Sequence, residues 1–238
     1  MIKLAVSGAC GKMGKRIIAL AQQDSDFKLV CALEHSAHLE LGTSICAGIN
    51  VAADNEEIKN CDVLIEFSSP QATISHLEQA IKFGKKVVIG TTGLLDEEKI
   101  KIEKAAEKIA VVFSPNMSIG VNLFFDIIKR LSSKISGNYD IKITEAHHVH
   151  KKDAPSGTAK RISEIIENSG KKVSDVKSIR EDEIIGDHCV IFSSSVDTIT
   201  LTHSAKTRDI FAAGALVAAK WVIDKRNGFY AMDDVLGL

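Results

Sequence analysis

A glycine-rich segment between a short apolar run and an amphipathic stretch is the feature that most constrains the fold. The apolar run Lys3–Ser7 leads into Gly8-Ala-Cys-Gly-Lys-Met-Gly14, and a helix is predicted from about Lys12 to Asp24. Glycines permit a tight turn and a close approach of strand and helix, while the start of a helix offers unpaired backbone N–H groups to a phosphate. The sequence therefore predicts a strand–turn–helix unit that can bind phosphate.

A carboxylate follows at the end of the next apolar run. Glu34 comes directly after Leu29–Leu33, and an acid about twenty residues beyond such a glycine segment can accept hydrogen bonds from the ribose of a dinucleotide. A carboxylate here favours NAD because it repels a 2′-phosphate. A protonated His35 would weaken that preference, and Lys12 and Lys15 are near the expected phosphates, so use of both cofactors stays open. A helix-capping turn with a chance acid is the structural alternative.

Strands and helices alternate over the first 115 residues. Further strands are predicted over Lys28–Leu33, Val63–Phe67, Lys86–Ile89 and Val111–Phe113, with helices over Ile74–Phe83 and Asp96–Ile109. This alternation predicts a parallel, doubly wound sheet whose ligands bind at the carboxyl ends of its strands. Asp96 is expected to cap its helix, and Gly84 is expected to end the helix before it.

Two short segments stand at the ends of predicted strands. Gly90-Thr-Thr-Gly93 follows Lys86–Ile89, and Phe67-Ser-Ser-Pro70 follows the preceding strand. Small hydroxyl-bearing residues at this edge of a doubly wound sheet can contact a nicotinamide ring. A plain turn is the alternative for both segments.

The pattern changes after Ser114-Pro-Asn-Met-Ser-Ile-Gly120. Helices are predicted over Val121–Ser133 and near Thr158–Asn168, and strands over Tyr139–Ala146, Lys177–Arg180, His188–Ser194 and Thr198–Ser204. Short connections between these strands predict an antiparallel or mixed sheet. The apolar helix Arg208–Val222 is expected to pack back on the first domain. We therefore expect an α/β protein with a Rossmann-type dinucleotide-binding domain over residues 1–118 plus 209–238, and an inserted α+β substrate domain over 119–208.

The most unusual composition follows the predicted strand Tyr139–Ala146. The run Glu145-Ala-His-His-Val-His-Lys-Lys-Asp-Ala-Pro-Ser-Gly-Thr158 contains three histidines and two lysines. An imidazole can transfer protons near pH 7, and an ammonium can bind a carboxylate or donate a proton. Ser156-Gly157-Thr158 at a helix start adds donors for a second carboxylate. The run predicts a site for a small dicarboxylate.

Two other interpretations of this run remain. It can be an exposed polar loop, or it can bind zinc through His147, His148 and His150. Alternation in an extended segment points His147 away from the other two, and no acid or cysteine stands at a familiar ligand spacing. We therefore expect no metal. The other histidines lack comparable neighbours: His76 lies within a predicted helix, and His38, His188 and His203 are expected to be structural or exposed.

The composition of the chain limits the kinds of molecule that it is expected to bind. Thirty basic and thirty-one acidic side chains give a net charge of −1, so no global field attracts nucleic acid or an anionic membrane. Five cysteines without a C-x-x-C pair are typical of free thiols in a reducing compartment. No apolar run approaches the length of a membrane span. We expect a cytoplasmic protein that binds neither nucleic acid nor membrane.

Taken together, these segments resemble the dihydrodipicolinate reductases (4-hydroxy-tetrahydrodipicolinate reductases) of bacterial and plant lysine biosynthesis. The resemblance covers the chain and rests on Gly8–Gly14, Gly90–Gly93, Ser114–Asn122 and above all Glu145–Thr158. It implies reduction of 4-hydroxy-tetrahydrodipicolinate to tetrahydrodipicolinate, with loss of water, by NADH or NADPH in the diaminopimelate route. It also implies hinges between the domains and a homotetramer built through the second one.

The resemblance assigns roles to individual residues. His147 is implied to be the catalytic proton donor and acceptor, and Lys151 a proton donor. His148, Gly157 and Thr158 are implied to bind substrate carboxylates. The implied nucleotide site consists of Gly8, Ala9, Cys10, Gly11, Lys12, Met13, Glu34, Gly90, Thr91, Thr92, Ser114, Pro115, Asn116 and Met117.

The chain departs from many members of that family at three places. His35 stands where many have an arginine for the 2′-phosphate, and Lys12 replaces a common arginine, so NADH is expected to compete with NADPH. The connection from Arg180 to His188 is short, which is expected to affect tetramer contacts.

Two rival hypotheses are an aspartate dehydrogenase-like oxidoreductase, which does not explain the run ending at Thr158, and a non-catalytic NAD-sensing module.

Overall fold

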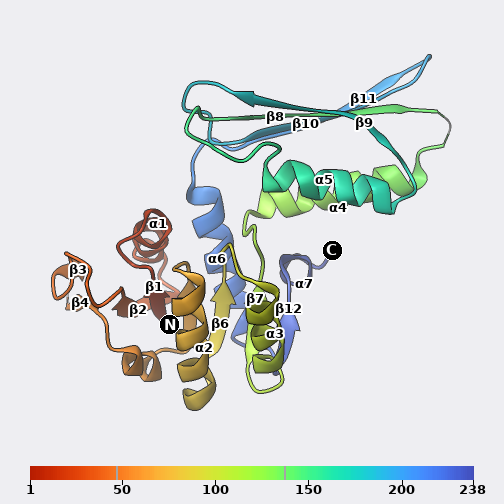
Figure 1. The fold of residues 1–238 in the computed structure, drawn as a ribbon. Coiled ribbons are helices and arrows are strands. Elements are labelled where there is room, and N and C mark those ends of the chain that lie inside the picture. The colour runs from red at the N-terminus through yellow and green to blue at the C-terminus, as the bar shows by residue number, and fades with distance from the viewer. Residues whose placement is uncertain (47, 137) are drawn as a thin grey trace. The chain divides into compact units, whose positions relative to one another are not determined.

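A computed structural model describes residues 1–46, 48–136 and 138–238. The chain divides into two compact units: Met1–Ile119 with Asp209–Leu238, and Gly120–Arg208. Each unit has its own sheet and its own helices (Figure 1). The predicted fold class, a Rossmann-type parallel sheet with a mixed-sheet α+β unit inserted before a C-terminal helix, is confirmed.

The first unit contains an eight-stranded sheet in the order β12-β7-β6-β5-β1-β2-β4-β3. Its strands are β1 (Ile2–Ser7), β2 (Phe27–Leu33), β3 (Ser44–Cys46), β4 (Ile49–Ala52), β5 (Val63–Glu66), β6 (Lys86–Ile89), β7 (Ala110–Phe113) and β12 (Gly228–Tyr230). Neighbouring strands are parallel except β3 and β4. The winding reverses at β1, which lies between β2 and β5, and such a switch point leaves a crevice outside the carboxyl ends of the strands.

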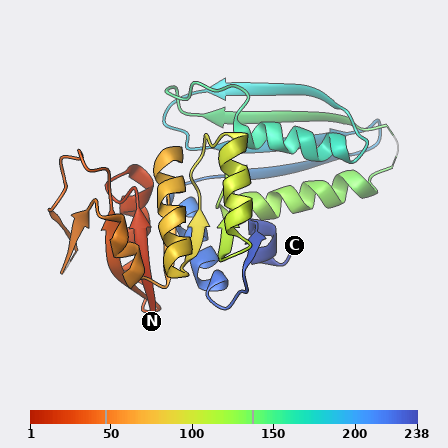
Figure 2. The same cartoon turned by 60° about the horizontal axis from the view of Figure 1, so that its bottom comes forward.

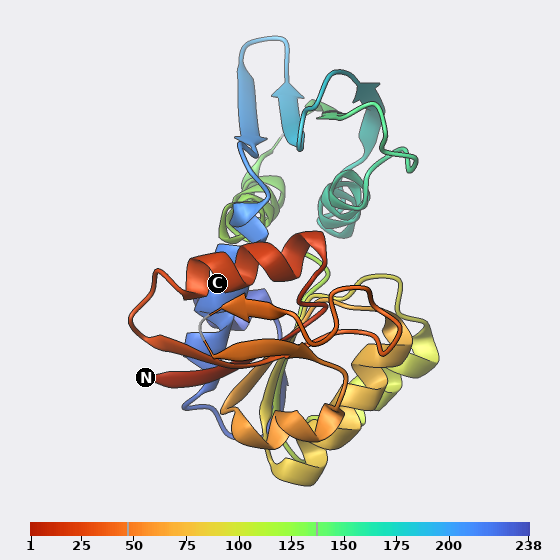
Figure 3. The same cartoon turned by 90° about the vertical axis from the view of Figure 1, so that its left-hand side faces the viewer.

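Helices cover both faces of this sheet (Figure 3). They are α1 (Lys12–Ala21), the 3-10 helix η1 (Asn55–Asn60), α2 (Pro70–Phe83), α3 (Asp96–Ala105), α6 (Asp209–Val222) and α7 (Met232–Leu236). On one face, α1, α6 and α7 pack against Leu4 and Val6 of β1, whereas η1, α2 and α3 pack against Ala5 on the other. Alternate residues of one buried strand therefore belong to two separate cores. As predicted, α6 packs on the first unit.

The second unit contains a four-stranded sheet in the order β11-β10-β8-β9. Its elements are α4 (Ile119–Lys134), β8 (Asp140–His147), α5 (Gly157–Asn168), β9 (Val173–Arg180), β10 (Asp187–Ser193) and β11 (Thr198–Ser204). Strands β8 and β9 are parallel and the other pairs antiparallel, so the sheet is mixed. Helices α4 and α5 lie along one face of it (Figure 2), where their apolar side chains pack against Ile141, Ile143, Val190 and Phe192.

Several predicted boundaries were wrong for identifiable reasons. Helix α2 begins at Pro70 because Ser69 caps it, accepting a hydrogen bond from the Ala72 N–H. Strand β9 begins at Val173, and a register shift after that residue interrupts the alternation of its side chains. Asp96 does not cap α3. Leu95 is the cap residue, and its N–H donates to Glu98 at 2.7 Å.

Five short elements were not predicted: β3, β4, β12, η1 and α7. None exceeds six residues, which is too short to display a period of side-chain burial. Gly84 does end α2 in the left-handed conformation, as predicted. Within the described ranges no helix combines the length and the apolar character that crossing a membrane requires.

Candidate active site

The Gly8–Gly14 turn requires glycine at two positions. Gly8 has φ +71°, and a Cβ there would lie 2.2 Å from the Phe67 carbonyl oxygen. A Cβ on Gly14 would lie 2.1 Å from the Gly8 carbonyl oxygen, so α1 starts directly against the turn. The Gly11 N–H closes the turn by donating to the Gly8 carbonyl at 2.9 Å. The backbone itself therefore forms this part of the candidate site.

Glu34 is held beside that turn. Its carboxylate accepts hydrogen bonds from the Cys10 N–H at 3.0 Å and the His35 N–H at 3.1 Å. Gly11 caps α1 without a side-chain hydrogen bond, so the first turn of the helix offers its N–H groups to an anion. The structure thus brings Glu34 to the glycine turn, as a dinucleotide site requires.

Lysine charge near this turn is partly offset. Lys15, in the first turn of α1, lies 2.8 Å from Glu40, and about half of each side chain is exposed. The hydrogen bond from Lys15 lowers the pKa of Glu40. Lys15 is therefore less available to a 2′-phosphate than its sequence position indicates.

The carboxyl ends of β5 and β6 meet through Thr91, which is buried. Its hydroxyl oxygen accepts hydrogen bonds from the Ser68 N–H at 3.2 Å and the Thr73 hydroxyl at 2.9 Å. A Cβ on Gly90 would lie 2.1 Å from the ring of Phe67, which covers it. Thr91 thus serves internal bonding with its side chain, while Thr92 is exposed.

The Ser114–Met117 segment is a compact turn. The Ser114 hydroxyl donates to the Asn116 carbonyl at 2.8 Å, and the Asn116 side chain accepts from the Ser118 N–H at 2.9 Å. The Met117 side chain is 1% exposed and belongs to the core. Of the predicted nucleotide residues here, Pro115 is exposed and Asn116 half-buried, whereas Met117 can offer little beyond its backbone.

A buried acid at the end of β5 pairs with a buried histidine of α2, and this pair was not predicted. Glu66 ends β5 with no exposure, and its carboxylate lies 2.7 Å from His76 Nδ1. The other ring nitrogen of His76 lies 3.0 Å from the Asn55 side-chain oxygen. His76 was expected only to lie within a helix, which α2 confirms, and its pairing with Glu66 is buried.

In the second unit, the helix-facing side of β8 changes from apolar to charged. Ile141, Ile143, Glu145 and His147 alternate along it and are all buried. Glu145 has no exposure, and His147 is 8% exposed. The Glu145 carboxylate is hydrogen-bonded to His147 Nδ1. Residues two apart on a strand share a face, which is why this acid and this imidazole meet.

Arg180 completes the pair. It ends β9 opposite His147, and its guanidinium binds both oxygens of Glu145, at 2.9 and 3.0 Å. Burial opposes ionisation of Glu145, but hydrogen bonds from Arg180, Ser178 and His147 lower its pKa to about 2. For His147, burial lowers the pKa and the bond to Glu145 raises it, with a lowered pKa as the result.

A second imidazole lies beside His147. His188 of β10 is 4% exposed, its ring centroid is 5.2 Å from that of His147, and its Nε2 lies 3.3 Å from the Ser156 hydroxyl. Burial, followed by the electrostatic interaction with the neighbouring His147, lowers the pKa of His188 to about 4. His188 was expected to lack such company. Antiparallel pairing with Glu145 places it there, and the sequence alone did not reveal that pairing.

The remaining predicted residues surround this cluster. Lys151 binds Asp153 at 2.8 Å, and its charge lowers the pKa of His147. Gly157 and Thr158 form the first turn of α5, which Ser156 caps by accepting from the Ala159 N–H. Nδ1 of His148 is buried and has no hydrogen-bond partner among the described residues. His147, Lys151 and the start of α5 are thus neighbours in the structure.

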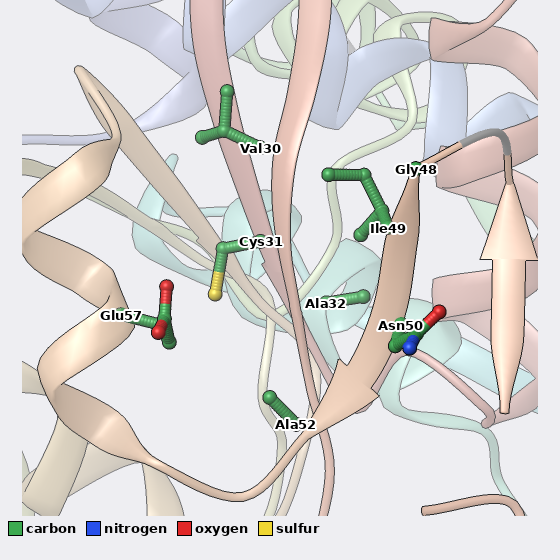
Figure 4. A pocket seen from close by; sticks show the side chains of 8 residues that line it. All are labelled: Val30, Cys31, Ala32, Gly48, Ile49, Asn50, Ala52 and Glu57. Atoms are coloured by element: carbon green, nitrogen blue, oxygen red, sulfur yellow. The ribbon is translucent and has the colours of Figure 1, made fainter. Parts of the chain in front are cut away.

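Two other features were not predicted, and the first of them includes Cys10 of the glycine turn. In the first unit, ligand atoms of Cys10, His38 and Glu40 lie within 4.8 Å of one another; the histidines of the predicted loop are not part of this group. A pocket beside β2, β4 and η1 is bordered by Cys31, Ile49, Glu57 and their neighbours (Figure 4). No predicted site residue borders it.

Comparisons with known proteins agree with this arrangement. The families described as "Dihydrodipicolinate reductase, N-terminus" and "Dihydrodipicolinate reductase, C-terminus" match residues 2–117 and 120–236. A 4-hydroxy-tetrahydrodipicolinate reductase of Citrifermentans bemidjiense is 36% identical, with all of both chains covered. A dipicolinate-bound dihydrodipicolinate reductase from Paenisporosarcina superposes with TM-score 0.83 at 23% identity, over 97% of both chains. Aspartate dehydrogenase from Thermotoga maritima shares the fold at TM-score 0.55 and 13% identity, over 92% of this chain and 96% of that one.

Proposed function

Since this chain belongs to the dihydrodipicolinate reductase family, we propose roles for its site residues in the reaction of that family. The chain is an oxidoreductase of lysine biosynthesis, a 4-hydroxy-tetrahydrodipicolinate reductase that uses NADH or NADPH. The observation that carries the assignment of roles is the buried Glu145–His147 pair next to the start of α5. This arrangement places a proton-transferring imidazole next to a helix start that can bind an anion.

The first unit holds the dinucleotide. Residues Gly8 to Met13 bind the pyrophosphate through backbone N–H groups, and Glu34 accepts hydrogen bonds from the adenosine ribose. The contact distances at Gly8 and Gly14 support this role, because side chains there would collide with the backbone that forms the turn. Glu34, and the pairing of Lys15 with Glu40, favour NADH over NADPH. When bound, the reduced nicotinamide supplies the hydride.

The second unit binds the substrate, a small dicarboxylate. The N–H groups of Gly157 and Thr158 bind one carboxylate at the start of α5, and His148 and Lys151 bind the other. The buried, unpartnered Nδ1 of His148 supports a ligand-binding role. His147 exchanges the proton through Nε2, since Nδ1 is engaged by Glu145. Lys151 donates a proton once substrate replaces Asp153 as its partner.

Assembly and location complete the proposal. Helices α4 and α5 cover one face of the second sheet (Figure 1), and the opposite face, which includes Thr144 and Ile191, supports association with further copies into a homotetramer. Analytical ultracentrifugation measures that state directly. All five cysteines are free, which supports a reducing compartment such as the cytoplasm.

The decisive test compares variants in a coupled assay that generates the substrate from pyruvate and aspartate semialdehyde. His147→Gln removes the proton carrier and should lower kcat about 10²- to 10⁴-fold with little change in KM. Lys151→Ala should damage both constants, because the ammonium binds and donates. Oxidation of NADH and NADPH, followed by nicotinamide absorbance, measures both constants and the cofactor preference.

The loop provides its own controls. His150 has a side chain that is 76% exposed, and Lys152 is exposed, so His150→Gln and Lys152→Ala should behave like the parent enzyme. Near-normal turnover of His147→Gln would remove that residue from the chemistry. Faster oxidation of NADPH than of NADH would overturn the proposed preference.

A further inference from the structure

Glu145, the buried acid next to His147, accepts more hydrogen bonds than are needed to hold the imidazole alone. Glu145 is fully buried, and it accepts hydrogen bonds from the Arg180 guanidinium, from His147 and from the Ser156 N–H at 3.3 Å. A buried carboxylate is unfavourable unless such partners compensate it. Glu145 therefore connects the imidazole, the α5 start and β9.

Resting on the roles proposed above, we propose that Glu145 and Arg180 are positioning residues of the reaction. Glu145 fixes the orientation and tautomer of His147, and Arg180 fixes both the Glu145 carboxylate and the backbone of the loop that carries Lys151. Neither side chain needs to contact substrate for this role.

The tautomer follows from the charge of Glu145. An ionised carboxylate only accepts hydrogen bonds, so Nδ1 of His147 carries its hydrogen and the neutral ring presents a free lone pair at Nε2. Gly186 keeps that nitrogen uncovered by a side chain, since a Cβ there would lie 3.1 Å from Nε2. Acid, ring and glycine together leave one nitrogen available for proton exchange.

Arg180 uses every donor it has. Nη1 and Nη2 each give one hydrogen bond to Glu145, and the two also donate to the carbonyls of Ile179 and Asp153, at 2.6 and 2.5 Å. Nε donates to the Lys151 carbonyl at 3.3 Å. A guanidinium has five N–H groups in a rigid fork, and a lysine cannot reproduce this set. Arg180 thus fastens the Lys151–Asp153 backbone to the same carboxylate that orients His147.

The charged groups around His147 set the sign of the expected titration shift. Glu145 from β8 favours the protonated ring, whereas Lys151 from the loop and Arg180 from β9 disfavour it, and His188 of β10 packs against the ring edge. Replacing Glu145 by a neutral isostere removes the favourable partner and keeps the unfavourable ones. The pKa of His147 should then fall.

The experiment compares Glu145→Gln, Glu145→Asp and Arg180→Lys in the full-length protein. Glu145→Gln should lower kcat about 100-fold or more, shift the His147 titration to lower pH and remove the single Nδ1–H tautomer, as seen by ¹⁵N NMR. Glu145→Asp keeps the charge and should restore part of the activity. Arg180→Lys should lower kcat at least about tenfold, because the loop carbonyls lose their donors. NADH affinity should not change.

Controls separate positioning from folding and from the assigned roles. Glu181→Gln and Arg161→Lys change exposed residues of the same types and should leave kcat and the His147 titration unchanged. An unaltered His147 tautomer and titration in Glu145→Gln, or parental kcat in Arg180→Lys, would overturn the inference. If His147→Gln itself remains active, the proposed roles fail instead. The NMR titration needs no turnover, so it reports on Glu145 either way.

Discussion

In the first unit, the Gly8–Gly14 turn offers backbone N–H groups and needs the absence of side chains at Gly8 and Gly14. In the second unit, Glu145, His147, His188 and Arg180 form a cluster of side chains, three of them buried and Arg180 half-buried. The first arrangement depends on a local run of the chain, and the second on three strands brought together. A site formed by the backbone can therefore be predicted from the local sequence, whereas a cluster of side chains depends on which strands pair and in which register.

The same contrast appears in two arginine–carboxylate pairs. Arg16 of α1 binds both oxygens of Asp209 at 2.5 and 2.6 Å, with side chains 48% and 30% exposed. Arg180 binds Glu145 in the same forked manner, but these side chains are 19% and 0% exposed. Water can replace either partner of the first pair and cannot readily replace those of the second. Burial therefore decides which pair is essential.

The largest expected effect tests this difference in burial. Arg180→Ala leaves Glu145 buried without its main partner and should lower the free energy of unfolding by about 3 to 5 kcal/mol. Arg16→Ala removes an exposed pair and should lower it by about 0 to 1 kcal/mol. Hydrogen exchange, resolved by unit, measures both changes in the full-length chain. Equal losses would show that burial does not separate the two pairs.

The next effect tests the glycine requirement. Gly14→Ala introduces a Cβ that would lie 2.1 Å from a backbone oxygen, and it should lower the free energy of unfolding of the first unit by about 3 kcal/mol and weaken NADH binding. Gly157→Ala is the matched change in the second unit, where a Cβ meets nothing within 4 Å. It should leave stability unaffected, and any loss should appear in KM for the substrate. A stable, NADH-binding Gly14→Ala variant would contradict the backbone-built site.

The smallest of these effects is the loss of stability of the second unit at acidic pH. His188 has a folded pKa of about 4, below its unfolded value, so the unfolded chain binds the extra proton and the stability that His188 contributes declines as pH falls from about 6.5 to about 4. Between pH 7 and pH 5 the second unit should lose about 2 kcal/mol. His188→Leu should flatten this dependence in hydrogen-exchange measurements. An equal acid response in both units would exclude His188 as its source.

At the alkaline end, the first unit should be the sensitive one. Burial raises the pKa of Cys31 and of Cys61 to about 12, so each thiol is protonated in the folded state at pH values where the unfolded chain ionises it. The stability these thiols contribute is present below about pH 9 and declines as pH rises toward 12. The first unit should therefore lose stability at alkaline pH because it buries two thiols, and the second at acidic pH because it buries His188.

Most of the parallel sheet could be predicted because apolar runs and helix caps are local signals. The omitted elements were short, and the start of β9 was hidden by an irregular register with β8. In the candidate site, His147 and Lys151 stood out by composition. Arg180 did not, because an arginine at a strand end gives no sign of the carboxylate it will meet. The alternation of Glu145 with His147 was a usable signal, since both follow the buried positions Ile141 and Ile143.

The sequence by itself determined the strand–turn–helix unit around Gly8, the acid at Glu34 and the histidine–lysine run, because each depends on neighbours within a few residues or on a fixed spacing. Only the tertiary structure decided that Met117 belongs to the core and that the Thr91 hydroxyl forms internal hydrogen bonds. It also decided that His188 pairs with Glu145 across two strands and that Arg180 binds the Glu145 carboxylate. Those outcomes depend on strand order and register, and many sequences with the same local pattern would pair their strands differently.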